Sequence, residues 1–545
     1  MTDCPVATYR IQLSPAFRFA DAAAVLPHIQ SLGVSHLYLS PIFEAVPGST
    51  HGYDQTDPSR IRAELGGRDG FLSLSSAAAR LGLKVLVDIV PNHMATHHTN
   101  PWWWGLLKNG KNSRFDRFFD VDWSAAADRV VLPVLGRPVD ECIERGEIRI
   151  DASDDASLVY YDKRFPLRPD ALPADLRSVS GAQLATLISR QHYELAEWRE
   201  GLRRINYRRF FDIADLAGVR VEDPGVVEDL HAGVFALISE GHIHGLRLDH
   251  VDGLLDPRSY CRTLRERLNA IAPPGVRPWI IVEKILGPHE TLPSDWGLDG
   301  TTGYDFLSAS LSLLVPQPVL QRCRDEAAAS GAAAPSFSSL RVRCKAEAAA
   351  LLGPELEHLV SLAGAAAGVA DCPLSPHAAR ECLVAICARL DVYRTYVDDD
   401  GISEADAARI RSAAALAEPA LSQSAREVLA VLTDLLTLDG SFDEGPARAA
   451  AQRLIRRWQQ FTGPVAAKGV EDTALYRDAA HPALNEVGSE PELHDPEARL
   501  LSLLHERAES FPYSMNATAT HDTKRGEDTR ARIAAALASE EGRPL

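Results

Sequence analysis

Short apolar segments alternate with helical patterns along much of this 545-residue chain, and this alternation most strongly limits the possible folds. Segments 7–13, 34–40 and 84–90 have the composition of strands, and an Ala-rich stretch that ends at Gly33 has that of a helix. Segments 244–251, 279–285 and 300–306 continue the rhythm, and 516–522 is a candidate seventh strand. Strands joined by helices form parallel sheets, so the sequence predicts an α/β fold of the (β/α)8 TIM-barrel type.

Two long regions interrupt this rhythm and divide the chain into five expected segments. Residues 91–204 are rich in aromatics, proline and charge, and we expect an inserted domain after the third strand. Residues 310–455 contain Ala-rich runs of strong helix formers, which predict a large helical insertion before the seventh strand. The barrel itself would then comprise residues 1–90, 205–309 and 456–545.

Charge and cysteine content limit the possible partners and compartment. A formal net charge of −18 disfavours nucleic acid, because binding to phosphates needs clustered Lys and Arg. No apolar run is long enough to span a bilayer, so no membrane partner is predicted, and the N-terminus lacks a secretory signal pattern. The eight cysteines form no CxxC pair, which indicates reduced thiols and a cytoplasmic location.

Carboxylates stand at the ends of four predicted strands, where the active site of a parallel β/α barrel lies. They are Asp88, Asp249, Glu283 and Asp522. Converging carboxylates cost stability, so such an arrangement usually serves chemistry. A pair of carboxyl groups is what retaining glycoside chemistry requires, one as nucleophile and one as acid and then base. Arg247 shares a strand face with Asp249 and can keep it ionised, whereas the apolar surroundings of Glu283 would raise its pKa and favour proton donation.

Each of these features also has a plainer interpretation. A single Asp at a strand end is more often a loop cap or an ion-pair member than a catalyst. His242, His244 and His250 resemble a metal group only superficially, and we predict no metal and no cofactor. The stretch THHTNPWWW could bind metal or sugar, with at least one tryptophan in the core.

The strand-end motifs resemble the signature regions of the α-amylase superfamily of glycoside hydrolases. DIVPNH (88–93), GLRLDH (245–250), VEKI (282–285) and THD (520–522) occur in that superfamily's order, and HGYDQTD (51–57) is similar to its loop with a sugar-stacking tyrosine. Within the superfamily, stretches such as GLRLDHVDGLLDP, AAKGVEDTALYR and NATATHDTKRGEDTRARI resemble the maltooligosyltrehalose synthases, glycoside hydrolase family 13.

This resemblance implies a role for each matching residue. Asp249 would be the nucleophile, Glu283 the acid/base and Asp522 the stabiliser of the transition state. The resemblance further implies substrate-binding or supporting positions at Tyr53, Asp88, Asn92, His93, Arg247, His250, Lys468 and His521. Tyr53 could instead be a packed aromatic, and Lys468 a surface ion-pair partner of Glu471 or Asp472. Few residues follow Asp522, so we expect the family's eighth strand and C-terminal β domain to be missing.

The resemblance implies an isomerase that acts on a maltooligosaccharide. Its reaction converts the reducing-end α-1,4 linkage into an α,α-1,1 linkage by intramolecular transfer, so water must be excluded from the intermediate. We expect aromatic side chains of residues 91–204 to help exclude water. Replacement of Trp103 with alanine should then raise the fraction of substrate that is hydrolysed. The alternatives are an α-glucan hydrolase or intermolecular transferase, and an inactive glucan-binding form. The implied pathway partner is a maltooligosyltrehalose trehalohydrolase.

Overall fold

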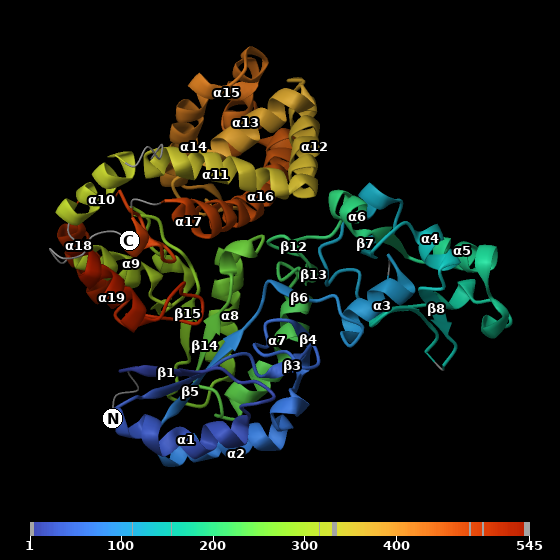
Figure 1. The fold of residues 1–545 in the computed structure, drawn as a ribbon, viewed down its shortest axis with the longest axis horizontal. Helices are drawn as coiled ribbons and strands as arrows, with labels where there is room; N and C mark the ends of the chain where they lie inside the picture. Colours follow the sequence, from blue (N-terminus) through green and yellow to red (C-terminus); the bar gives the residue numbers. More distant parts are fainter. Residues whose placement is uncertain are drawn as a thin grey trace. The chain divides into compact units, whose positions relative to one another are not determined.

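The computed structural model describes residues 5–538 except 112, 154, 316, 330–334, 479–480 and 493–494. The chain divides into two compact units (Figure 1). Unit 1 comprises residues 1–250 and 266–279, and unit 2 comprises 251–265 and 280–545.

Unit 1 contains four neighbouring parallel strands in the order β1-β2-β5-β14. They are β1 (Thr8–Ile11), β2 (His36–Leu39), β5 (Lys84–Ile89) and β14 (Gly245–Leu248). Every residue of β2 and β14 is buried, as expected for a parallel sheet covered on both faces. The four strands predicted at 7–13, 34–40, 84–90 and 244–251 are therefore confirmed.

The helices between these strands begin and end where the sequence provides caps. Helix α1 (Phe19–Ser31) begins where Asp21 accepts the Arg18 N–H at 2.8 Å, and the chain leaves it through Gly33 at φ +78°. Helix α7 (Pro224–Ser239) starts with proline, and the Asp223 carboxylate caps it. Helix α2 (Gly67–Arg80) lies alongside α1 (Figure 1).

The region between β5 and α7 is built from short elements that form small separate sheets. Strands β8, β9 and β10 are antiparallel, β7 and β11 are parallel, β12-β13-β6 form a third sheet, and β3 and β4 form a hairpin earlier in the chain. The elements are β3 (Phe43–Ala45), β4 (Gln55–Ile61), β6 (His93–Ala95), α3 (Pro101–Asn109), β7 (Val130–Leu135), α4 (Val139–Glu144), β8 (Ile148–Asp151), β9 (Ser157–Tyr160), β10 (Lys163–Pro166), α5 (Gly181–Ser189), β11 (Tyr193–Glu197), α6 (Trp198–Arg204), β12 (Arg209–Phe210) and β13 (Ile213–Gly218).

Unit 2 is mostly helical. Strand β15 (Trp279–Val282), which begins in unit 1, pairs in parallel with the short β16 (Gly300–Thr301), and β17 (Val397–Asp398) with β18 (Gly401–Ile402) form a small hairpin. The helices are α8 (Pro257–Ile271, shared with unit 1), α9 (Tyr304–Leu314), α10 (Gln317–Ala329), α11 (Phe337–Leu351), α12 (Gly353–Val369), α13 (Pro376–Arg389), α14 (Glu404–Ala417), α15 (Gln423–Thr437), α16 (Gly445–Ala466), α17 (Leu475–Arg477), α18 (Pro496–Ser510) and α19 (Glu527–Ala538).

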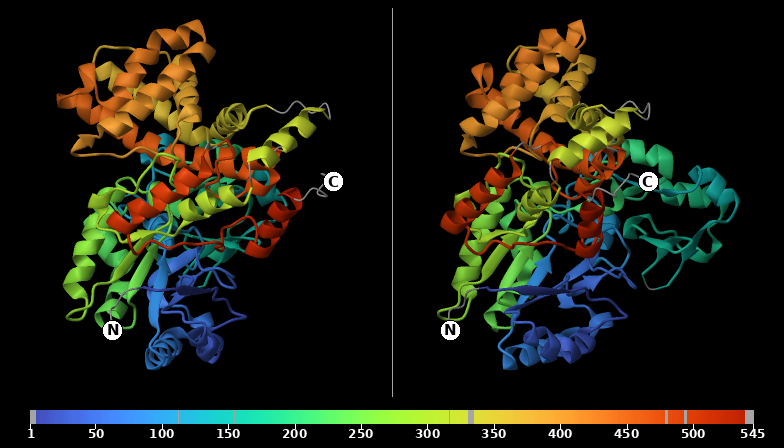
Figure 2. Two further views of the ribbon diagram at one scale, coloured as in Figure 1. Left: turned by 90° about the vertical axis from the view of Figure 1, so that its left-hand side faces the viewer. Right: turned by 60° about the vertical axis from the view of Figure 1, so that its left-hand side comes forward.

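Helices α12 to α16 pack around one apolar core, and both views in Figure 2 show them grouped together. Fully buried side chains from five helices meet there, including Leu359, Ile386, Ile410, Leu432 and Trp458. Helix α16 continues through residues 455 and 456, the boundary that the sequence pattern predicts between two segments, and passes directly into a π-helical turn at Ala467–Ala474.

Two strand predictions in unit 2 need correction. At 300–306 only Gly300 and Thr301 form a strand, because Gly303 adopts φ +95° and helix α9 begins at Tyr304. Segment 516–522 contains no strand. Arginine side chains bond backbone carbonyls in and next to this segment instead. Arg507 donates to the Met515 oxygen at 2.9 Å, and Arg530 donates to the Thr518 oxygen at 2.5 Å. Such side-chain bonds compete with a strand ladder despite the threonine content.

Candidate active site

A buried cluster of charges lies at the carboxyl ends of β5 and β14 in unit 1. The register places Arg247 opposite Asp88. The Arg247 guanidinium donates from Nη1 to Asp88 Oδ1 at 3.0 Å and to Asp249 Oδ1 at 2.5 Å. Arg247 and Asp88 are almost fully inaccessible, whereas Asp249 retains 12 % of its side-chain exposure. One cation therefore supports two carboxylates, of which Asp249 is the one that a ligand can reach.

Two tyrosines complete the hydrogen bonding of Asp88. Tyr53 Oη donates to Asp88 Oδ2 at 2.5 Å, and Tyr38 Oη donates to the same oxygen at 3.2 Å. Burial, followed by the nearby Asp88 charge, raises the pKa of both phenols, so both remain donors. Arg10 Nη2 in turn donates to Tyr53 Oη at 3.2 Å. Sequence analysis found Tyr53 but missed Arg10 and Tyr38; polar residues inside the predicted strands 7–13 and 34–40 were the available signal.

His93 is a buried neutral imidazole beside this cluster. Burial, followed by the nearby His250 and Arg208 charges, lowers its pKa to about 3. Its ring stacks on Phe210 with centroids 4.3 Å apart. A neutral ring can donate and accept hydrogen bonds at neutral pH without adding charge.

Residues in and next to β12 contact Asn92 and His250. Arg208 Nη1 donates to Asn92 Oδ1 at 2.6 Å, and Arg208 Nε to Asp120 Oδ2 at 3.0 Å. His250 adopts φ +48° and packs edge-on against Phe210 and Phe211. A side chain held in the left-handed region carries a cost that functional sites often retain. Neither phenylalanine nor Arg208 was found from the sequence, because they become neighbours only through the long inserted region.

In unit 2, Glu283 directly follows β15 and is half-buried. The next residue, Lys284, is fully buried, with its ammonium 2.7 Å from Glu290 Oε1 and 3.4 Å from Asp252 Oδ2. Tyr396 Oη donates to Asp252 Oδ1 at 2.5 Å. These contacts fix the chain on the carboxyl side of Glu283.

Asp522 and its neighbours lie in the irregular segment before α19. Tyr304 Oη lies 2.9 Å from Thr520 Oγ1 and donates to Asp522 Oδ2 at 3.2 Å, and His521 Nε2 is 3.2 Å from the same carboxylate. Half of the Asp522 side chain is exposed. A phenol and an imidazole therefore orient a carboxylate that remains accessible.

Lys468 lies on the π-helical turn and forms an ion pair with Asp472 at 3.4 Å. Asp472 also pairs with Lys524 at 2.9 Å. The adjacent Glu471 is half-buried, and desolvation raises its pKa to about 7. The ion pair predicted as the plainer interpretation of Lys468 is thus present, and it belongs to a larger charged group.

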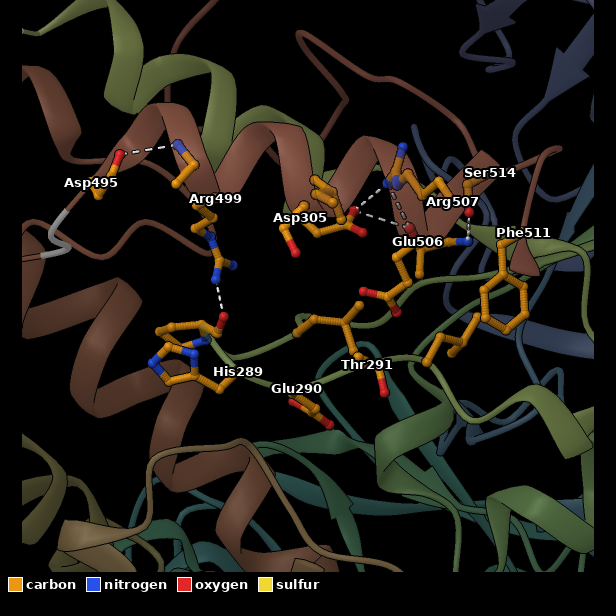
Figure 3. Close-up of a pocket in the computed structure, with 17 residues that line it drawn as sticks. His289, Glu290, Thr291, Asp305, Asp495, Arg499, Glu506, Arg507, Phe511 and Ser514 are labelled. Atoms are coloured by element: carbon orange, nitrogen blue, oxygen red, sulfur yellow. Dashed lines mark hydrogen bonds and ion pairs between the residues drawn. The ribbon is translucent and has the colours of Figure 1, made fainter. Parts of the chain in front are cut away.

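A separate cavity of about 460 Å³ in unit 2 contains none of the residues selected from the sequence. Figure 3 shows Asp305 paired with Arg507, Arg499 directed at the backbone near His289, and Glu506 facing Thr291. Helix α18 supplies the two arginines.

Among the described residues, no group of three or more His, Cys, Asp or Glu side chains could hold a metal ion. His242 and His244 bind protein groups instead: His242 Nδ1 lies 3.2 Å from Ser75 Oγ, and His244 Nδ1 accepts the Val85 N–H at 3.2 Å. No helix in the described part of the chain is long and apolar enough to cross a membrane.

Comparison with known proteins identifies the family. The model of the α-amylase catalytic domain matches residues 23–265. A Mycobacterium tuberculosis protein named as a maltooligosyl trehalose synthase is 39% identical over 97% of this chain and 64% of its own length. The chain thus contains an α-amylase catalytic domain and is similar, within that superfamily, to the maltooligosyltrehalose synthases.

Solved structures of this family agree with that assignment. Maltooligosyltrehalose synthase from Arthrobacter ramosus matches with a TM-score of 0.83 and 37% identity, covering 98% of this chain and 65% of that one. A Sulfolobus tokodaii structure, titled a hypothetical maltooligosyl trehalose synthase, matches with a TM-score of 0.78 and 31% identity, covering 98% of this chain and 64% of that one. The fold is therefore of the α-amylase type. The chain spans about two thirds of the length of these synthases, 64% for the M. tuberculosis relative.

Proposed function

We propose that this chain carries the catalytic part of an intramolecular glucosyl transferase, an isomerase that converts the reducing-end α-1,4 linkage of a maltooligosaccharide into an α,α-1,1 linkage. The observation that carries the proposal is the buried Arg247 that supports the accessible Asp249 at the end of β14, in a chain 39% identical to a named synthase over 97% of its length.

The proposed first step forms a glucosyl-enzyme. The Asp249 carboxylate attacks the anomeric carbon, the bond to the terminal glucose breaks, and Glu283 gives its proton to the departing oxygen. Arg247 keeps Asp249 ionised, because its guanidinium lies 2.5 Å from that carboxylate. Asp522 would stabilise the positive charge of the transition state.

In the second step the released glucose turns and presents its anomeric hydroxyl to the same carbon. Glu283, now a carboxylate, takes the hydroxyl proton, and the new C–O bond displaces Asp249. The two displacements each invert the anomeric carbon, so together they leave the donor sugar in the α configuration. The neutral His93 and the phenol of Tyr53 would bind sugar hydroxyls, together with Asp88, Asn92, Arg247, His250, Lys468 and His521 as supporting or binding residues.

The finer organisation is part of the same proposal. We infer a (β/α)8 barrel for the catalytic domain, with residues 91–204 and 310–455 as insertions. The free thiols among the described cysteines favour a cytoplasmic location. A trehalohydrolase that consumes the product is the proposed pathway partner.

The test is incubation of the purified chain with maltopentaose while reducing ends and product sizes are followed together. Loss of reducing power at constant chain length, abolished in Asp249→Ala, supports the isomerase. A rise in reducing ends would favour the hydrolase, and transfer to longer chains the intermolecular transferase. Glucan binding without turnover would favour the inactive binding form.

A further inference from the structure

A cavity of about 240 Å³ in unit 1 lies between the loop that carries Tyr53 and the short sheets of the inserted region. Its lining includes Asp54, which directly follows Tyr53, and His97 and His98, which follow β6. Strand β10 contributes Lys163, Arg164 and Phe165. We propose that this cavity binds glucose units of the maltooligosaccharide that are remote from the reacting linkage; the inference rests on the proposed function.

Aromatic side chains form the base of the cavity. Trp103 and Phe165 are buried, and Trp103 packs edge-on against Tyr207 with centroids 5.3 Å apart. Tyr207 donates its hydroxyl to the Ala214 oxygen at 2.7 Å, so its ring is fixed. Rigid aromatic walls suit the apolar faces of sugar rings.

The two histidines present neutral polar groups. Burial, followed by the charges of His97 and Arg164, lowers the pKa of His98 to about 4, and burial also lowers the pKa of His97. His97 Nδ1 accepts the Thr99 N–H at 3.3 Å, which leaves the proton of the neutral ring on Nε2. Within the described residues, the His98 ring makes no hydrogen bond. Neutral imidazoles that donate and accept hydrogen bonds match sugar hydroxyls.

The charges in the cavity already have partners. Lys163 pairs with Asp215 at 3.5 Å, Arg164 pairs with Asp151, and Asp54 accepts the Ser49 hydroxyl at 2.6 Å. The lining therefore favours a neutral ligand over an anion. The cavity volume of about 240 Å³ is below the range of about 300–1,000 Å³ that is typical of sites for drug-sized ligands. A cavity of this size fits one or two sugar units.

The chain itself holds the two histidines in place. Asn100, the N-cap of α3, donates from Nδ2 to the Ala95 oxygen at 2.8 Å and accepts the N–H groups of Trp102 and Trp103. The Thr96 N–H bonds the Asp215 oxygen at 2.8 Å. The stretch that sequence analysis left open between metal and sugar thus forms a fixed wall of the cavity, and no metal-binding group was found among the described residues.

The experiment compares substrates of different length. In His98→Ala, and in Val134→Trp, which fills the cavity from β7, KM for maltohexaose should rise about tenfold, the effect of losing roughly 1.4 kcal/mol of binding. KM for maltotriose and kcat for both substrates should change less than about twofold. His28→Ala, an exposed histidine of α1 outside the cavity, is the matched control.

A rise in KM that is equal for both substrates, or no rise, would overturn the inference. Calorimetric titration with maltohexaose distinguishes failure of the binding-site inference from failure of the proposed function. If the wild-type chain binds the glucan without isomerising it and His98→Ala binds it about tenfold more weakly, the function fails and the binding site stands. Equal binding by both proteins, or no binding by the wild type, would overturn the binding site.

Discussion

At the scale of single residues, the site depends on one guanidinium that serves two carboxylates. Arg247 is 1 % exposed and bonds both Asp88 and Asp249. Removing one partner of a buried ion pair leaves an uncompensated charge, which costs more than the pair contributes. The position of Asp249 is therefore linked to the burial of Asp88.

Arg247→Lys should separate geometry from charge. Lysine keeps the positive charge but lacks the planar fork that reaches two carboxylates at once. Displacement of Asp249 by about 1 Å is expected to lower kcat on maltopentaose about 100-fold. The matched control is Arg68→Lys, which alters an exposed ion pair with Glu240 at 2.6 Å and should leave kcat unchanged. Wild-type kcat in Arg247→Lys would contradict the role given to this residue.

The sequence was sufficient to find Asp88, Arg247 and Asp249, because all three stand at the ends of apolar strands whose period fixes their direction. It was insufficient for Arg208, Phe210 and Phe211. The phenylalanines contact His93 or His250, and Arg208 bonds Asn92, only after the inserted region has folded, and no local pattern encodes those contacts. Lys284 was overlooked because a lysine beside Glu283 gave no sign that burial between Asp252 and Glu290 would follow.

At the scale of elements, the parallel strands of unit 1 were predictable and the irregular segment at 516–522 was not. Strands β2, β5 and β14 are rich in apolar residues, and glycines such as Gly33 and Gly82 mark the turns before β2 and β5. Segment 516–522 has the composition of a strand, but Arg507 and Arg530 bond carbonyls at 515 and 518 from α18 and α19. Long-range side-chain bonds of this kind override local propensity.

Two tryptophans of helix α3 differ in burial, and their replacement should affect stability differently. Trp103 is 1 % exposed and packs edge-on against Phe119 and Tyr207, whereas Trp104 is half-buried and donates to Asp155 at 2.8 Å. Trp103→Ala should lower the free energy of unfolding by about 3–5 kcal/mol, and Trp104→Ala by much less. Urea denaturation followed by circular dichroism measures both. Equal losses in the two variants would contradict a core position for Trp103.

Helix α7 should make unit 1 sensitive to acid through His231. Burial lowers the pKa of this imidazole to about 3, from its ordinary value of 6.5. The unfolded chain therefore binds more protons between pH 3 and 6.5, and stability falls as pH decreases through that window.

His231→Gln should reduce this loss by up to about 1.4 kcal/mol per pH unit. Unfolding free energies measured at pH 7, 6 and 5 would show a shallower slope than in the wild type. The control His28→Gln changes an exposed histidine and should leave the slope unaltered. An unchanged slope in His231→Gln would mean that the folded protein accepts a proton on His231.

At the scale of the whole molecule, the cysteines are distributed over both units without forming any disulfide among those described. Seven are free, six of them are buried, and only Cys372 has intermediate exposure; Cys4 lies outside the described residues. Burial raises the pKa of Cys382 to about 12 and that of Cys387 to about 11, which keeps both as unreactive thiols at neutral pH.

Thiol titration should therefore differ sharply between the folded and unfolded protein. In denaturant without reductant, Ellman's reagent should titrate all eight cysteines, because the seven described cysteines are free thiols. In the native state at pH 8, Cys372 should react before the six buried thiols, whose reaction requires local opening. Cys372→Ser should abolish that early phase, and Cys382→Ser should leave it intact. Fewer than eight thiols in denaturant would show a disulfide. Rapid native reaction of Cys382 and Cys387 would mean that the apolar core of helices α12 to α16 is not closed.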